Sequence, residues 1–388
     1  MDIKAFQSAA AGRLVRSIEG HWTFVPHPLP PTIEWTPDLV RALSQADRAM
    51  GRLSGMGGIF PNPHLLIHPF QQREAVFSSR IEGTQASLAD LYNYQHSEDA
   101  ATRSPEDTGE VANYVSALQY GIEMMREGNL ITLNLLRKLH AVLLADARGQ
   151  WRSPGKFRNQ IVHIGPPHSH IEEATFVPPA QNEMLEALNL WEQYLHNTSN
   201  LPPLIRLGLI HYQFEAIHPF FDGNGRIGRL LLILLLMSWD LLPQPLLYLS
   251  AYFEHYRKDY YDLLLAVSQS GAWESWLVYF LRGVTYQSQD ALQRGLALLS
   301  LYEHYRQRYQ TFGKIQGMVE LIFENPYHIT AKIVAQELSI SSPTAYHYLT
   351  TLVEDSILQQ RSDRQKGRVY VAEAVKRIIE APLSEVAT

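Results

Sequence analysis

The chain has 388 residues, a formal net charge of −6 and no cysteine. This length exceeds what one simple core usually fills, so we expect two or three domains. The absence of cysteine excludes disulfides, thiolate metal sites and a cysteine nucleophile, and it suits a cytoplasmic protein. The negative charge excludes a globally basic nucleic-acid-binding face, although it leaves room for a local basic patch.

Neither a targeting sequence nor a membrane span is expected. Residues 1–15 lack the long apolar core of a signal peptide. The most apolar run, residues 230–242, contains Ser238 and Asp240 and is far shorter than the roughly 20 residues that a spanning helix needs. We therefore predict a cytoplasmic protein without a membrane partner, and a buried core helix at this run.

The first hundred residues combine an extended arm with two helices. Residues 20–37 carry five prolines among aromatic residues, which predicts an extended arm that lies on another part of the protein. Thr36 and Pro37 fit the N-cap and first position of a helix, and another helical pattern runs over 63–79. The first of these helices has one apolar stripe, formed by Leu39, Leu43, Ala46 and Met50.

The middle of the chain is expected to be mainly helical. After a polar loop at 97–108, helical periodicity covers 109–127, 132–145, 180–196 and 203–216, and further helices run to about 310. Residues 149–179 differ, because glycine, proline and short alternation predict a β-hairpin or an ordered loop there. The predicted fold class is therefore mainly α, a helical bundle with a short β-hairpin.

A change of pattern after residue 312 predicts a separate C-terminal domain. The order helix, turn, helix and two short strands is typical of a winged helix-turn-helix, over 330–372. Its second helix, 342–352, has no lysine or arginine, and the basic residues of the wing are Arg361, Arg364, Lys366 and Arg368. Because phosphate contacts dominate DNA affinity, a DNA partner and a role in protein interaction or dimerisation both stay open. The predicted domains are 1–110, 111–310 and 312–388.

The stretch AIHPFFDGNGRIGRLL, residues 216–231, concentrates the chemically capable side chains. Gly223 and Gly225 permit a tight turn between two helices, and the second helix should start near Arg226. Its free N–H groups and positive dipole end would form an anion site. Arg226 and Arg229 are three residues apart, hence on one helical face, and could both reach one phosphate chain.

Three further side chains of this stretch suit phosphate chemistry. Asp222 is a hard oxygen ligand that suits Mg²⁺ bridging phosphates. His218 is the nearby group whose ordinary pKa suits proton abstraction near neutral pH. Asn224 could donate a hydrogen bond to a phosphate oxygen. A base, a metal carboxylate and a phosphate clamp together predict nucleotidyl or phosphoryl transfer.

The run from His218 to Arg229 resembles, without a gap, the signature HxFx[D/E]GNGRxxR of the Fic family. The resemblance implies a helical fold that transfers AMP from ATP to a Ser, Thr or Tyr hydroxyl of a protein. It implies that His218 is the catalytic base, that Asp222 holds Mg²⁺, and that the phosphates are bound by Gly223, Asn224, Gly225, Arg226 and Arg229. Family members that phosphorylate instead carry a lysine where Gly225 stands.

The resemblance extends to three other segments. Residues 157–177 are similar to the family's flap, which would align a target segment by strand addition, with Ile164 and Gly165 beside the nucleotide. Tyr260 and Tyr261 match a tyrosine pair that some relatives place beside adenine. The pattern of Ser78, Glu82 and Gly83 resembles the family's inhibitory motif [S/T]xxxE[G/N].

Spacing supports a regulatory role for this last segment. Ser78 and Glu82 lie four residues apart on one helical face, with Gly83 suited to stop the helix, which is expected over about 64–83. A carboxylate at position 82 could pair with Arg229 and block productive ATP binding. The tetrapeptide Ile-His-Pro-Phe at 67–70 repeats residues 217–220, but no Gly or Asn follows it, so His68 has no phosphate cradle and is interpreted as a residue at a helix start.

The leading hypothesis is an ATP- and Mg²⁺-dependent protein adenylyltransferase that Glu82 inhibits. Its partner would be a target protein docked at the flap, or the protein itself, and we expect a homo-oligomer. One alternative is the reverse activity, removal of AMP, in which Glu82 would orient a water molecule. Another is a transcriptional regulator whose Fic-like part only senses nucleotide.

Overall fold

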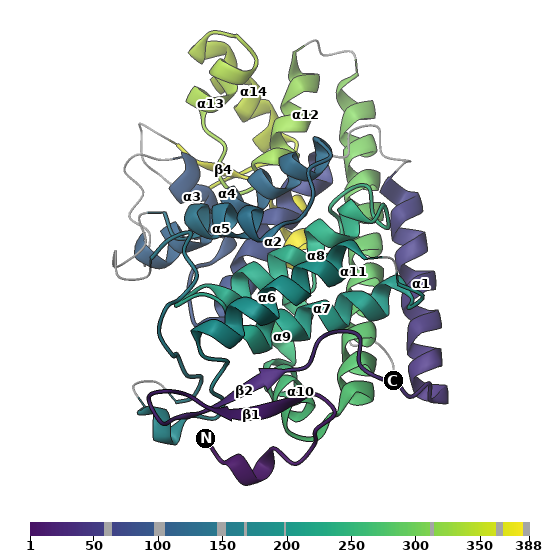
Figure 1. The fold of residues 1–388 in the computed structure, drawn as a ribbon. Helices are drawn as coiled ribbons and strands as arrows, with labels where there is room; N and C mark the ends of the chain where they lie inside the picture. Colours follow the sequence, from purple (N-terminus) through teal and green to yellow (C-terminus); the bar gives the residue numbers. More distant parts are fainter. Residues whose placement is uncertain are drawn as a thin grey trace.

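A computed structural model describes residues 1–57, 64–96, 105–145, 153–166, 169–197, 199–310, 314–361 and 368–382. The described chain is mainly helical, which confirms the predicted fold class (Figure 1). The helices up to residue 217 are α1 Pro37–Gly57, α2 His64–Ile81, α3 Leu88–His96, α4 Pro105–Arg126, α5 Leu133–Leu143, α6 Gln181–His196 and α7 Pro203–Ile217. Those that follow are α8 Asn224–Ser238, α9 Ser250–His255, α10 Arg257–Ser270, α11 Trp273–Tyr309, α12 Ile315–Glu324, α13 Ala331–Glu337, α14 Ser342–Glu354 and α15 Glu373–Glu380.

The N-terminal segment contains a β-hairpin that the sequence did not predict. Strand β1, Gly12–Arg16, pairs antiparallel with β2, Trp22–Pro26, so the expected extended arm begins only after residue 26. The Phe24 N–H donates to the carbonyl of Val177, and the Phe24 ring lies 5.7 Å from Phe176. The hairpin therefore packs against the end of the segment expected to be the flap.

Helix α8 is the centre of the core. Every residue from Ile227 to Leu236 is buried, because the helix is covered by α7, α4, α5 and α2. A helix that is apolar all round belongs in such an interior position. The expected core helix is confirmed, and among the described residues no helix has the length and apolar run needed to cross a membrane.

Helices α11 and α2 pack around this core. Helix α11 is 37 residues long, runs along α1 and carries the buried Trp273, Trp276 and Tyr279 (Figure 1). Thr36 caps α1 as predicted, since its side-chain oxygen accepts from the Leu39 N–H at 3.2 Å. Helix α2 has Pro69 in its interior and packs against α4, α8, α9 and α12. Burial on several sides explains its weak apolar periodicity. The helix ends at Ile81, between the end of the helical pattern at 79 and the expected limit of the inhibitory helix at about 83.

The C-terminal part has the expected order of elements. Helices α12, α13 and α14 are followed by β3, Gln359–Gln360, and β4, Tyr370–Val371, which pair antiparallel. Ile329 forms a further bridge with Tyr370. Arg364 and Lys366 of the predicted wing lie outside the described residues. Of the predicted domain limits, residue 110 falls inside α4, and the limit near 311 falls between α11 and α12.

A buried ion network joins the C-terminal end of the chain to α11 and α2. The Arg294 guanidinium makes two hydrogen bonds of 2.8 Å to the Asp290 carboxylate, and it donates to the carbonyls of Ile379 and Ala381 at the end of α15. Arg73 of α2 lies 3.5 Å from the same carboxylate. These side chains are at most 10% exposed, so each charge depends on its partners.

This network predicts a large loss of stability for Arg294→Met. The change leaves Asp290 with one cation and frees the α15 carbonyls, which should cost about 3–5 kcal/mol of unfolding free energy, as expected for a broken buried pair. Arg306→Met on the same helix is the matched control, because its pair with Glu303 is exposed and should contribute less than about 1 kcal/mol. Urea unfolding of both variants measures the difference, and equal losses would contradict the assignment.

Candidate active site

The loop between α7 and α8 brings the predicted base and anion site together. Helix α7 ends at Ile217, and His218 follows with φ 50° and ψ 62°, a left-handed conformation that is uncommon outside glycine. Gly223, with φ 77°, precedes the first helical residue, Asn224. The helix therefore starts two residues earlier than predicted, and its first N–H groups face the loop.

Asn224 closes this loop with its side chain. Its Oδ1 accepts from the Phe220 N–H and its Nδ2 donates to the Phe220 carbonyl, both at 2.8 Å. The side chain is buried, so in this structure the amide organises the loop. The phosphate contact expected for Asn224 stays a prediction.

His140 of α5 packs against the loop between α7 and α8. Its ring stacks on Phe220 at a centroid distance of 3.8 Å, and its Nε2 lies 2.9 Å from the Asp222 carbonyl. Nδ1 accepts from the Gly155 N–H at 2.9 Å, which makes Nε2 the donor. Burial lowers the pKa of His140 to about 4, so the neutral ring persists at physiological pH.

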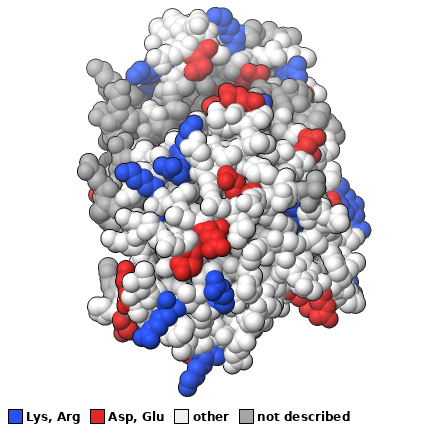
Figure 2. Space-filling model, in the orientation of Figure 1, with Lys and Arg blue, Asp and Glu red and all other residues white. Residues whose placement is uncertain are grey.

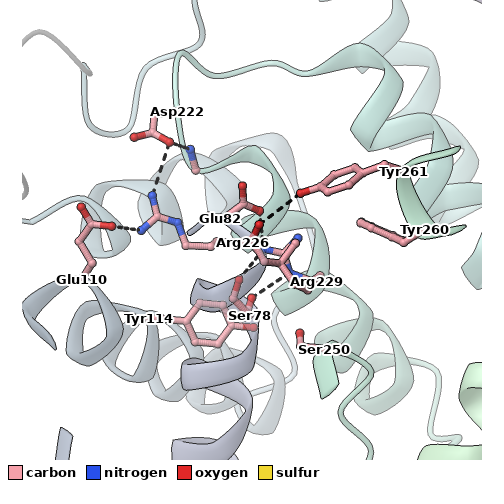
Figure 3. A network of polar contacts seen from close by, with 12 residues as sticks. Ser78, Glu82, Glu110, Tyr114, Asp222, Arg226, Arg229, Ser250, Tyr260 and Tyr261 are labelled. Carbon is pink, nitrogen blue, oxygen red and sulfur yellow. Dashed lines mark hydrogen bonds and ion pairs between the residues drawn. The ribbon is translucent and has the colours of Figure 1, made fainter. Parts of the chain in front are cut away.

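Both arginines of the motif are buried and paired with carboxylates (Figure 3). Arg226 lies 3.1 Å from Glu110 of α4 and 3.5 Å from Asp222. Arg229 donates from Nε to Ser78 Oγ and from Nη2 to the Ser78 carbonyl, each at 2.9 Å, and Nη2 lies 2.6 Å from Glu82 Oε1. Two cations thus lie in the first turns of α8, beside its positive dipole end.

Glu82 reaches Arg229 because α2 ends beside α8. After Ile81 the chain turns, and Gly83 takes φ 100°, consistent with its predicted role as a helix stop. Glu82 Oε1 lies directly over Gly225, where any Cβ would collide with it. The close approach therefore needs glycine at 225. The Glu82 side chain is 35% exposed, so the ion pair faces the open side of the site.

Two further carboxyl groups lie close to this pair. Glu74, one turn before Ser78 on α2, accepts from the Tyr114 hydroxyl at 3.1 Å and from the Ser250 hydroxyl and N–H. Burial raises its pKa to about 7. Burial, with a contribution from Glu82, raises the pKa of Glu215 to about 8. Near neutral pH these two groups are partly protonated, which limits the negative charge around Arg229.

The tyrosine pair is divided between the core and the site. Tyr260 is 1% exposed and its hydroxyl lies 2.9 Å from His211 Nε2, whereas Tyr261 is 40% exposed and its hydroxyl donates to the Ile81 carbonyl at 3.5 Å. In Figure 3 the Tyr261 hydroxyl points toward the end of α2. Tyr261 is therefore the member of the pair that a ligand beside Glu82 can reach.

The expected flap is less regular than a β-hairpin. Among the described residues of this segment, one bridge, Ile164 to Phe176, joins its two sides, and residues 171–173 form a 3₁₀ turn. The Ile164 side chain is exposed, and Gly165 packs closely against Ala174. His168, part of a histidine-rich stretch, lies outside the described residues.

The donor set around Asp222 fits a magnesium ion that arrives with phosphates. Mg²⁺ in nucleotide sites usually takes one or two protein carboxylates and completes its shell with phosphates and water. Asp222 supplies one carboxylate, 33% exposed, at the mouth of the α8 anion site. Its Oδ1 accepts from the Gly223 N–H at 2.6 Å, which fixes the orientation of the group.

Several supporting residues had no signal in the sequence. Only the fold shows that Glu110 meets Arg226, that His140 meets Asp222 and that Ser250 meets Glu74. Arg158 lies inside the predicted flap, but nothing in that pattern marked it as a partner of His218. His218 itself contacts Arg158, whose Nε donates to the His218 carbonyl at 2.8 Å. In the sequence, these four are polar residues within helical patterns or in the predicted hairpin or loop. Such residues are too common for this context to identify the four as parts of the site.

Comparison with known families supports this site. Residues 130–236 match the model described as Fic/DOC family, and residues 40–123 match Fic/DOC family N-terminal. The chain is 27% identical over 193 residues to protein adenylyltransferase Fic of Aedes aegypti and 30% identical over 174 residues to that of Drosophila virilis. These alignments cover 49% and 43% of this chain, and they span about a third of each relative, 35% and 34%.

Solved structures show the same fold. A Fic family protein from Desulfovibrio desulfuricans G20 superposes with a TM-score of 0.58 at 21% identity, over 89% of this chain and 98% of that one. Fic-1 from C. elegans superposes with a TM-score of 0.52 at 20% identity, over 66% of this chain and 73% of that one. The first likeness covers most of this chain.

The buried His211 beside the site predicts a sensitivity to acid. Burial, followed by the charge of Arg229, lowers its pKa to about 3, whereas an unfolded histidine titrates near 6.5. The unfolded state therefore binds a proton first as pH falls, and stability present above pH 6.5 is lost below it. His211→Gln should reduce this loss by about 3 kcal/mol between pH 6.5 and 4.

Urea unfolding at several pH values measures this difference. His347→Gln, at an exposed position of α14, is the control and should follow the unmodified protein. An unchanged pH dependence in His211→Gln would show that His211 does not carry the effect.

Proposed function

We propose that the protein is a protein adenylyltransferase, because residues 130–236 match the Fic/DOC family model and residues 40–123 match the model of the family's N-terminal region. It would transfer AMP from ATP to a Ser, Thr or Tyr hydroxyl of a protein and release pyrophosphate. The observation that carries the proposal is one loop that places a neutral imidazole, a carboxylate and two arginines at the start of α8. Relatives named protein adenylyltransferase Fic support it.

The reaction assigned to this geometry is a displacement at the α-phosphorus. His218 takes the proton of the target hydroxyl, whose oxygen forms a bond to the α-phosphorus while the bond to the pyrophosphate oxygen breaks. Burial and the Arg158 charge lower the pKa of His218 to about 4, so the base is neutral at physiological pH. The α8 N-terminus, Arg226 and Arg229 stabilise the charge that develops on the phosphates.

Magnesium is the cofactor of this proposal. Asp222 would hold the ion, which neutralises phosphate charge when it is bound. Arg226 pairs with Asp222 here at 3.5 Å, so the carboxylate is already oriented within the anion site before ATP binds. Glu110 gives Arg226 a second partner, which would keep that guanidinium in place if Asp222 held a metal ion.

Glu82 is proposed to keep the resting enzyme weakly active. Its carboxylate occupies the Arg229 guanidinium and lies over Gly225, where the phosphates of ATP would bind. ATP must therefore displace a charge-assisted hydrogen bond before its terminal phosphate meets Arg229. Ser78 holds the same guanidinium from the buried side, so Arg229 stays in place when Glu82 leaves.

Two parts of the molecule are proposed to bind partners, the flap and the C-terminal part. The flap, with the exposed Ile164, is the proposed docking place for a target segment, from another protein or from a second copy of this chain. The C-terminal part is interpreted as a winged helix-turn-helix. On the face shown in Figure 2, described basic residues are scattered among acidic ones. Helix α14 carries no lysine or arginine, so we favour protein interaction or dimerisation over DNA binding.

Labelling with ATP tests the proposal directly. The purified protein, Glu82→Gly and the double variant Glu82→Gly/His218→Ala are incubated with Mg²⁺ and ATP labelled on the α-phosphate. Glu82→Gly should label protein at least about tenfold faster than the unmodified chain, because Arg229 becomes available to phosphate. The double variant should lose the labelling, since its base is missing.

Two controls separate the alternatives. ATP labelled on the γ-phosphate should leave no label on protein, because pyrophosphate departs. Equal labelling with and without His218 would refute the proposal. A Glu82→Gly variant that loses the ability to remove AMP from a modified protein, without gaining transfer, would establish the reverse activity. A promoter footprint that survives His218→Ala would instead favour a nucleotide-sensing regulator.

A further inference from the structure

Arg158 lies at the base of the flap and is almost fully buried, at 1% exposure. Its guanidinium donates to four backbone carbonyls: Nε to His218 at 2.8 Å, Nη1 to Gln160 at 3.0 Å, and Nη2 to Pro179 at 2.6 Å and to Ile217 at 3.3 Å. The Arg158 N–H donates to a fifth carbonyl, that of Pro219, at 2.9 Å. One residue thus binds both ends of the flap and three consecutive residues of the catalytic loop.

These contacts hold a strained backbone. His218 has φ 50° in the left-handed region, which costs free energy for a residue with a Cβ and persists only when its surroundings enforce it. The α7 C-terminus leaves carbonyls without helical partners, and the guanidinium satisfies those of Ile217 and His218. The direction of the imidazole therefore depends on Arg158.

Hydrogen bonds to backbone carbonyls surround the Arg158 charge. Within the described ranges, no carboxylate forms an ion pair with it, although its guanidinium is buried beside His218. A buried positive charge disfavours a second one nearby. The groups that act on His218 are Arg158 from the flap, Glu82 from α2, Asp222 from the loop and the Glu215 carbonyl from α7.

We propose that Arg158 is the positioning residue of the catalytic base: it fixes the left-handed backbone of His218, places a buried positive charge beside the imidazole, and joins the flap to the base as one rigid unit. The proposal rests on the proposed function, because it assigns His218 the role of base. Its consequence is geometric. A target segment aligned on the flap is placed relative to His218 by the guanidinium, and not by contacts of its own with the loop.

Lysine cannot replace arginine in this role. Three nitrogens of one planar fork point in separate directions to the carbonyls of His218, Gln160 and Pro179, whereas an ammonium is a point charge on a flexible stem. Arg158→Lys therefore keeps the buried charge and loses the fork. Arg158→Met loses both, so the two variants separate geometry from electrostatics.

The test compares Glu82→Gly with Glu82→Gly/Arg158→Lys and Glu82→Gly/Arg158→Met. Both Arg158 variants should lower kcat of AMP transfer at least about tenfold and change KM for ATP less than about twofold, since nucleotide contacts remain. With Arg158→Met, the acid limb of the pH–rate profile should move upward from near 4, because burial still lowers the His218 pKa but the contribution of the Arg158 charge is gone. With Arg158→Lys, the acid limb of the pH–rate profile should not move, because the positive charge is kept.

An NMR titration of the histidines gives a readout independent of activity. The His218 signal is identified by its loss in His218→Ala, and its pKa should rise in Arg158→Met but not in Arg158→Lys. A kcat within about twofold of Glu82→Gly for Arg158→Lys would overturn the geometric role. An unchanged His218 pKa in Arg158→Met would overturn the electrostatic role.

The two proposals fail in different ways. If Glu82→Gly transfers AMP while Arg158→Lys keeps full kcat, the proposed function stands and the positioning role is refuted. If no variant transfers AMP but the His218 pKa responds to Arg158→Met, the proposed function is refuted and the electrostatic contact stands. If Arg158→Met does not fold, Arg158→Lys alone decides, through the expected loss of kcat with an unchanged acid limb.

Discussion

The requirement that a buried guanidinium be paired organises this protein. Arg229 is 1% exposed and sits in the part of α8 that is buried at every residue from Ile227 to Leu236, so an unpaired charge there would be strongly destabilising. The partners come from α2, which must therefore lie along α8 with its last turn at the anion site. Ser78 supplies two contacts from the buried side and Glu82 one from the open side. Of these three contacts, only the one from Glu82 faces the open side, so only this contact can be replaced by a contact to a ligand.

The position of α2 depends in turn on contacts far from the site. Glu74 is tied to α4 through Tyr114 and to α9 through Ser250, and Arg73 shares Asp290 with Arg294, which holds the end of α15. The Tyr92 and Tyr327 rings stack at 4.8 Å and join α3 to the segment after α12. The helix that presents Glu82 is thus continuous, through buried polar groups, with the C-terminal part. A partner that moved α15 would act on the same helix.

The sequence predicted the residues of the motif from His218 to Arg229 better than the residues that hold this motif in place. His218 to Arg229 are contiguous, so the turn and the common face of the two arginines followed from spacing, whereas the helix start was predicted two residues late. Glu82 was predicted because Ser78, Glu82 and Gly83 resemble the family's inhibitory motif and because Ser78 and Glu82 lie four residues apart. Glu110, His140 and Arg158 were missed, since each meets the loop only through tertiary packing. The β1–β2 hairpin was missed because prolines after residue 25 made the whole segment resemble an extended arm.

The repeated tetrapeptide shows why such local prediction has a limit. Ile-His-Pro-Phe occurs at 67–70 and at 217–220, and in both places the phenylalanine is buried. At 67–70 the peptide continues through the interior of α2, and His68 Nδ1 lies 3.1 Å from the Glu324 carbonyl. At 217–220 the helix ends and His218 turns into the left-handed region. Proline disfavours helix for the residue before it, so the copy inside α2 is the one that opposes local preference.

What differs is the surroundings of each histidine. The first copy is followed by Gln71 and Gln72 and is enclosed by helices that keep the backbone helical. The second is followed by glycines that allow the chain to turn, and Arg158 captures the carbonyls that the broken helix exposes. A helix that stops in this way leaves His218 beside the N-terminus of α8, which is where the proposed function needs its base. The proposed chemistry therefore depends on where α7 ends, and the hydrogen bonds from the Arg158 guanidinium to Ile217 and His218 stabilise that end.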